Sequence, residues 1–188
     1  MNRREFLRST ATIGFAATGC WRQPSAQPTT PTTAVAERLF DLMSQRLAIM
    51  VDVARTKWNS KGAIEDPARE RALVASMADA GREFKLEPAE TTAFFTAQIE
   101  ASKIIQREKF REWEAEGRGP FTDAPDLVRD LRPKIDAVGR ELLETLAAFK
   151  AGGQIPAGEL RRLAATRIVG PGVTDEVRAA AVRPLTDG

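Results

Sequence analysis

Residues 34–59, AVAERLFDLMSQRLAIMVDVARTKWN, decide the fold of this 188-residue chain. Apolar side chains recur every three or four positions along this stretch, which is the spacing of an amphipathic α-helix with one buried stripe. Polar and small residues at 59–62 then end the pattern. We therefore expect one long N-terminal helix that packs against the rest of the protein through a single face.

Two cations interrupt the buried stripe of this helix. Arg46 and Lys57 are three helical turns apart, so at about 100° per residue they return to nearly the same face. That face also carries the apolar residues Leu39, Met43, Met50 and Ala54. Burying a charge is costly unless something pairs it, so two inward cations favour a pocket shaped for an anionic ligand.

The helical period continues to the end of the chain, and no run of alternating β-branched residues competes with it. Asp66 is placed to cap the second helix, with Pro67 in its first position. Pro133 either kinks the fourth helix or marks its start. The predicted helices cover residues 34–59, 67–81, 88–117, 126–150, 157–167 and 174–183. The fold class is therefore all-α, a single helical bundle domain over residues 34–188.

The composition limits the classes of partner. With 43% hydrophobic and 29% charged residues, the chain can bury a sizeable core in one domain. The formal net charge of +2 comes from the signal-like N-terminus, and the remaining charges balance. The bulk charge therefore gives no reason to expect binding to nucleic acid or to an anionic membrane.

The residue types that are missing exclude several kinds of chemistry. The chain has no His, and its only Cys is Cys20. Ser-His-Asp and Cys-His catalysis and His- or Cys-ligated metal sites are therefore excluded. The sequence also has no Gly-rich phosphate loop and no calcium-loop spacing of acidic residues. We expect neither a metal nor a nucleotide cofactor.

The first 20 residues are typical of an export signal. Twin arginines at residues 3–4 precede a weakly apolar run at 11–18, which resembles a twin-arginine signal and is too short to span a bilayer. The sequence ATGC at residues 17–20 resembles a lipoprotein cleavage box, with Ala where Leu is usual. Either a lipid is attached to Cys20, or ordinary cleavage removes the signal. A Pro- and Thr-rich linker at 21–33 follows the signal. Because of the signal, we expect an exported protein that is either periplasmic or tethered to the membrane as a lipoprotein.

Polar residues also lie on the apolar faces of the later predicted helices. Ser102 and Gln106 are one turn apart, so their side chains can converge on one ligand. Arg69 and Glu70 follow directly after the Asp66 cap. Each of these residues has an ordinary structural explanation when taken alone, such as a surface charge or a bond to its own helix. We interpret the combination, with the two inward cations, as a candidate binding site.

Six segments carry a more specific signal when they are taken in order. They are Ser44-Gln45-Arg46-Leu47, Lys57-Trp58, Ile64 to Glu70, Phe94-Phe95, Gln98 to Gln106 and Leu131 to Ile135. Together they resemble the all-helical chorismate mutases, in particular the secreted bacterial subclass, from about Leu39 to Gln106 with a weaker continuation to Lys150. The resemblance implies an isomerase that rearranges chorismate to prephenate without a metal or a cofactor. It also implies a homodimer, which is common in the subclass.

The resemblance assigns roles to the cations and to one amide. Arg46, Arg69 and Arg132 would hold the two carboxylates of chorismate, and Lys57 and Gln106 would donate to its ether oxygen. That oxygen gains negative charge as its bond breaks. Lys57 is therefore the strongest candidate for stabilising the transition state.

The remaining roles concern the ring hydroxyl and the scaffold of the site. Glu70 would accept a hydrogen bond from the ring hydroxyl, Ser102 would help to seat a carboxylate, and Asp66 would cap and orient its helix. One extra residue precedes Arg132 compared with the family pattern, so Arg129 is the alternative third arginine.

Two hypotheses compete with a working enzyme. The chain could be an exported helical binding or scaffold module whose inward charges form structural salt bridges, or a dicarboxylate-binding relative without turnover. Salt bridges would need matching carboxylates, whereas the site set holds four cations against Asp66 and Glu70. The complete set therefore favours the enzyme.

Overall fold

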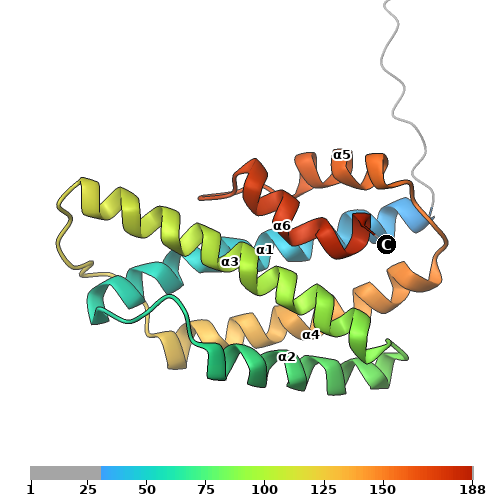
Figure 1. Ribbon diagram of the computed structural model, residues 1–188, viewed down its shortest axis with the longest axis horizontal. Coiled ribbons are helices and arrows are strands. Elements are labelled where there is room, and N and C mark those ends of the chain that lie inside the picture. The colour runs from blue at the N-terminus through green and yellow to red at the C-terminus, as the bar shows by residue number, and fades with distance from the viewer. Residues whose placement is uncertain (1–30, 188) are drawn as a thin grey trace, which may run out of the picture.

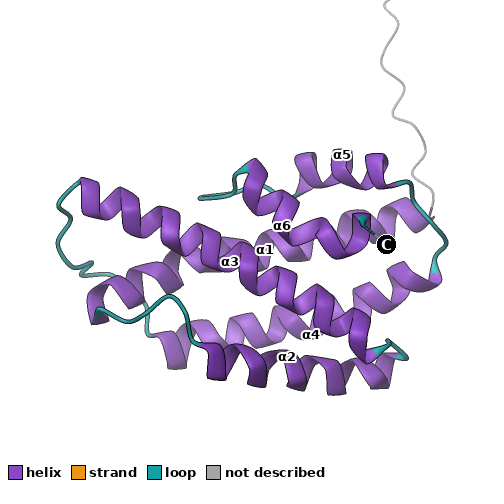
Figure 2. Ribbon diagram, viewed as in Figure 1, coloured by secondary structure: helices purple, strands orange, loops and turns teal. Residues whose placement is uncertain are grey.

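The computed structural model describes residues 31–187. The predicted export signal, Cys20 and most of the predicted linker lie outside the described residues. Within the described range the chain contains helices and no strand, which confirms the all-α fold class (Figure 2). None of the described helices is both long enough and apolar enough to cross a membrane.

In the described part of the chain, six α-helices and two short helical turns form the bundle. They are α1 (Pro31–Ser60), α2 (Pro67–Gly81), the 3-10 turn η1 (Arg82–Phe84), α3 (Pro88–Ala115), the π-helical turn η2 (Leu127–Leu131), α4 (Arg132–Ala151), α5 (Ala157–Arg167) and α6 (Asp175–Thr186). In Figure 1, α2 and α4 lie along one side of the long helices α1 and α3, and α5 and α6 lie along the other.

The first helix begins earlier than the sequence pattern predicts. It starts at Pro31 and not at residue 34, so it includes the last residues of the predicted linker. Proline is favoured in the first turn of a helix because its missing N–H is not needed there. In addition, Thr32 Oγ1 donates a 2.5 Å hydrogen bond to the carbonyl of Gly152, just after α4. This contact ties the start of α1 to a distant segment, which local periodicity cannot reveal.

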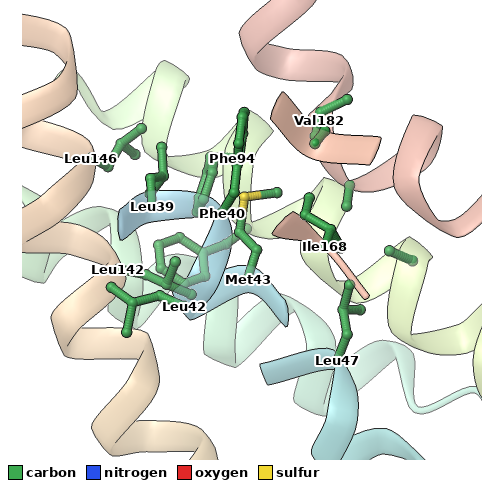
Figure 3. Packing of buried hydrophobic residues seen from close by; sticks show 14 of the residues in the cluster. Leu39, Phe40, Leu42, Met43, Leu47, Phe94, Leu142, Leu146, Ile168 and Val182 are labelled. Carbon is green, nitrogen blue, oxygen red and sulfur yellow. The ribbon is translucent and has the colours of Figure 1, made fainter. Parts of the chain in front are cut away.

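The hydrophobic core forms around the apolar face of α1. The four apolar residues predicted on this face are all buried: Leu39, Met43, Met50 and Ala54. Figure 3 shows the buried side chains of α1 between Leu142 and Leu146 of α4 on one side and Ile168 and Val182 on the other. Each large apolar side chain buried in this way contributes about 1.5–3 kcal/mol. The core thus fixes α1 rigidly, and with it the two cations on the same helix.

Candidate active site

The eight residues predicted to form a site all line one open pocket of about 160 Å³. The pocket lies where α1, α2, α3 and the start of α4 meet. Its polar lining includes Arg46, Lys57, Asp66, Arg69, Glu70, Ser102, Gln106 and Arg132. Its apolar lining includes Met50, Val53, Leu73, Ile99, Leu127 and Ile135. Residues from four segments far apart in the sequence therefore surround a single space.

Arg46 is the most deeply buried cation of the pocket, with 4% of its surface exposed. Its Nη1 donates to Ser102 Oγ at 2.8 Å and to the carbonyl of Gln98 at 3.2 Å. Burial lowers the pKa of Arg46 to about 10, and the negative charge of Asp136 partly opposes this shift. Arg46 is therefore charged at neutral pH, although among residues 31–187 it makes no ion pair. A buried cation held only by neutral acceptors is suited to an anionic ligand.

Lys57 is half-buried at the opposite end of the same helical face. Its Nζ donates a 2.8 Å hydrogen bond to the carbonyl of Ile64 in the loop before α2. Burial lowers the pKa of Lys57, while the nearby carboxylates of Asp66 and Glu70 act in the opposite direction. An ammonium group has three N–H donors, so two are left after the bond to Ile64. Those donors are available to an acceptor atom of a ligand.

The first turn of α2 is held by reciprocal hydrogen bonds. Asp66 caps the helix by accepting from the backbone N–H of Arg69 at 3.1 Å, and Pro67 occupies the first turn, as predicted. In return, Glu70 Oε1 accepts from the backbone N–H of Asp66 at 3.1 Å. The turn therefore presents Arg69, which is exposed, and Glu70 to the same pocket in a fixed arrangement.

Gln106 brings a buried amide to the pocket, with 4% of its surface exposed. Its Nε2 donates to the carbonyl of Ser102 at 3.1 Å and lies 4.0 Å from the sulfur of Met50. Its Oε1 is buried and has no hydrogen-bond partner. The second N–H of the amide faces only a weak sulfur acceptor, so a ligand oxygen could replace that contact at little cost.

Arg132 is brought to the pocket by the π-helical turn that precedes it. In this turn the N–H of Leu131 bonds the carbonyl of Asp126, and the N–H of Arg132 bonds the carbonyl of Leu127, both five residues back. A π-helical turn holds more residues than an α-helical turn, which fits the extra residue that the family resemblance implies before Arg132. Pro133 then lies in the first turn of α4, so it marks the start of the α-helix and does not kink it.

The two candidate arginines of this segment have different surroundings. Arg132 lines the pocket, and its Nε is buried without a partner. The side chain of Arg129 is 82% exposed and pairs with Asp130 at 3.2 Å. The structure thus places Arg132 at the pocket and Arg129 on the surface.

One pocket residue, Lys103, was missed by sequence reasoning. It is 7% exposed and its Nζ makes ion pairs with Glu100, Glu70 and Glu65. Burial has the largest single effect and would lower the pKa of Lys103, but the three carboxylates together raise it. The feature of the sequence that could have identified Lys103 is its spacing, because it lies three residues before Gln106 on the same helix.

Sequence comparisons agree with the resemblance. Residues 32–107 match the pattern of the family described as chorismate mutase type II. The chain is 31% identical over 109 residues to the secreted chorismate mutase of Mycolicibacterium smegmatis, covering 58% of this chain and 60% of that protein. It is 29% identical over 115 residues to the secreted chorismate mutase of Mycobacterium tuberculosis, covering 61% of this chain and 57% of that protein. The matches thus span somewhat less than two thirds of these curated relatives.

Solved structures give a more complete match. The crystal structure of chorismate mutase from Burkholderia thailandensis superposes with a TM-score of 0.73 at 30% sequence identity, covering 81% of this chain and 99% of that one. The secreted chorismate mutase from Yersinia pestis shares the fold, with a TM-score of 0.68 at 23% identity, covering 79% of this chain and 94% of that one. The fold, the family pattern and the near-complete match at 30% identity lead to one conclusion. This chain belongs to the chorismate mutase type II family.

Proposed function

We propose that this protein is a chorismate mutase, which converts chorismate to prephenate by an intramolecular rearrangement. One observation carries the proposal: of the five cationic side chains that line the pocket, only Lys103 is paired with carboxylates, and the other four make no ion pair among residues 31–187. Chorismate carries two carboxylates and therefore matches this excess of positive charge. The unpartnered polar atoms of Gln106 and Arg132 also support a polar ligand in the pocket.

The proposed mechanism depends on holding a flexible substrate in its compact, reactive shape. The reaction is a one-step rearrangement within one molecule, so it needs no nucleophile and no base from the protein. Arg46, Arg69 and Arg132 approach the pocket from three different helices and would fix the two carboxylates. Positioning and electrostatic stabilisation of this kind can supply on the order of 8 kcal/mol, the lower end of enzymatic rate accelerations.

The second part of the mechanism is stabilisation of the ether oxygen. Lys57 and Gln106 would donate to this oxygen as negative charge grows on it in the transition state. Glu70 would accept from the ring hydroxyl, and Ser102 would seat a carboxylate beside Arg46, to which it is already hydrogen-bonded. Asp66 would act through the first turn of α2, which it caps.

The proposal is tested by incubating the purified protein with chorismate and following the loss of substrate absorbance. Prephenate is then measured as phenylpyruvate after treatment with acid. Turnover without added metal or cofactor is the expected result. If a folded protein shows no turnover, binding of chorismate-like dicarboxylates would indicate a non-catalytic relative, and absence of binding would favour the scaffold module.

We also propose that the chain is exported, because its N-terminal sequence resembles a twin-arginine signal and two relatives are named as secreted. The periplasmic form and the form with a lipid on Cys20 are distinguished by mass spectrometry of the mature protein from membrane and soluble fractions. A homodimer is part of the same proposal and is tested by the mass of the purified protein in solution.

A further inference from the structure

Lys103 is a buried cation in the pocket wall to which the proposed reaction gives no role. Its side chain is 9% exposed, and its Nζ lies 2.7 Å from Glu100 Oε1, 3.1 Å from Glu70 Oε2 and 3.2 Å from Glu65 Oε2. An ammonium group has three N–H donors, and three carboxylates occupy them here. Lys103 therefore has no donor left for a substrate carboxylate, so any effect on the substrate must pass through its partners.

Of these partners, only Glu70 is a pocket residue for which a substrate contact is proposed. Its two carboxylate oxygens have different donors: Oε1 accepts from the backbone N–H of Asp66, and Oε2 accepts from Lys103. Two donors on separate oxygens fix the plane of the carboxylate, whereas one donor would let it rotate. Each oxygen still has a lone pair that can accept from a ligand hydroxyl.

We propose that Lys103 is a positioning residue that fixes the Glu70 carboxylate as the acceptor for the substrate's ring hydroxyl and so makes the site selective for hydroxylated dicarboxylates. This inference rests on the proposed function. It adds a specificity-determining residue outside the set that the family resemblance supplies. The selectivity follows because an acceptor that is held in place meets a ring hydroxyl without a loss of side-chain entropy, and a compound that lacks the hydroxyl gains nothing from it.

If the role of Lys103 were purely structural, its replacement would disturb the loop before α2 and would not act on Glu70 in particular. Lys103 also ties Glu65, in the loop before α2, to α3. However, Glu65 has a second anchor on α3, the ion pair with Arg107, so the loop keeps a tether when Lys103 is replaced. Glu70 makes no other ion pair among residues 31–187. Removing the ammonium should therefore act mainly on Glu70.

The test is the Lys103→Met variant, which keeps the length of the side chain and removes its donors. Kinetics with chorismate should show KM raised about tenfold and kcat changed by less than about threefold, because the hydroxyl is held in both ground and transition states. Affinity is also measured for two bicyclic ether dicarboxylates that imitate the compact transition state, one with the ring hydroxyl and one without. Binding of the hydroxylated compound should weaken about tenfold while binding of the deoxy compound is unchanged.

Two further variants separate positioning from general damage. Lys103→Arg keeps the charge and the donors, so it should restore most of the selectivity. Glu100→Gln removes the charge of the carboxylate that lies closest to Lys103 but leaves the contact with Glu70, so both affinities should equal those of the wild type. Circular dichroism and thermal unfolding check that each protein is folded. If Lys103→Met does not fold, Lys103→Leu, which also lacks donors, takes its place.

The outcomes are distinguishable. Equal weakening of both compounds, or no weakening of either, overturns the role of Lys103 while wild-type turnover leaves the proposed function standing. If wild-type protein neither turns over chorismate nor binds either compound, the proposed function fails and the inference fails with it. In the Glu70→Gln background, Lys103→Met should have no further effect on selectivity; a second, additive loss would also overturn the inference.

Discussion

Arg46 on α1 and Ser102 on α3 are joined by a 2.8 Å hydrogen bond from the guanidinium to the hydroxyl oxygen. Both groups also donate to the carbonyl of Gln98, Ser102 at 2.6 Å and Arg46 at 3.2 Å. These three hydrogen bonds orient the guanidinium through groups of the protein itself. A cation oriented in advance binds a carboxylate without losing further side-chain entropy, which favours tight and specific binding.

Replacing Ser102 with Ala should loosen this arrangement. We expect KM for chorismate to rise about tenfold with little change in kcat, because the carboxylate contact is made in both ground and transition states. Thr145→Ala is a matched control, since Thr145 is partly exposed, lies outside the pocket and donates its hydroxyl only to the carbonyl of Glu141 in its own helix. An unchanged KM in Ser102→Ala would show that the hydroxyl does not orient Arg46.

The two arginines around the π-helical turn provide a matched pair. Arg132→Ala should lower kcat/KM about 10- to 100-fold, because a buried charged donor to the substrate is lost. Arg129→Ala should have no effect, since that side chain is exposed and pairs with Asp130. Steady-state kinetics of the two variants under one set of conditions gives the comparison. The reverse ranking would mean that the segment rearranges when substrate binds.

The pH dependence of turnover tests the roles of Gln106 and Lys57. An amide donates at any pH, and no described pocket residue ordinarily titrates near neutrality, so kcat should be nearly constant from roughly pH 5 to 8. Burial lowers the pKa of Lys57. The ammonium is the form present below that pKa, so activity should be lost only on the alkaline side. A sharp loss between roughly pH 5 and 8 would contradict this assignment.

A variant at the same position should create the acid dependence that the wild type lacks. A carboxylic acid donates only when it is protonated, so Gln106→Glu should be most active at low pH and lose activity as pH rises through the pKa of the new side chain. The pH profile of kcat/KM measures this directly. An unchanged flat profile would mean that residue 106 does not donate to the ether oxygen.

The unpartnered oxygen of Gln106 also predicts a conflict between stability and activity. Its Oε1 is buried with no partner, and such an atom lowers stability by about 1–3 kcal/mol. Gln106→Leu should therefore raise the free energy of unfolding by about 1 kcal/mol in urea titrations while it lowers turnover strongly. A destabilised Leu variant would indicate that the amide contributes more through its bond to the Ser102 carbonyl than its oxygen costs.

Much of the fold was predictable because helices leave a local signal. The period of the apolar residues predicted the helices, and Asp66 with Pro67 predicted the start of α2. The early start of α1 and the π-helical turn were not predictable in this way. The first depends on a contact between Thr32 and Gly152, and the second depends on how Leu131, which is 2% exposed, packs into the core ahead of Pro133.

The candidate site also has one part that was predictable from the sequence and one part that was not. Arg46, Lys57, Ser102 and Gln106 could be placed on inward faces by counting residues along their own helices. The environment of Lys103 could not be predicted, because two of its carboxylate partners belong to the loop before α2 and to α2 itself. Its burial follows from the packing of α2 against α3, which is a tertiary property.

The most direct test of the central claim is chorismate turnover by the wild type and by Lys57→Ala, expressed and purified in parallel. Parallel purification matters because a mutase from the expression host would contaminate both samples equally. We predict rapid turnover by the wild type and a loss of about a hundred- to a thousandfold in Lys57→Ala, because one donor to the developing charge is removed. Identical circular dichroism spectra would show that the fold is intact. No turnover by the folded wild type, or equal rates for the two proteins, would contradict the account.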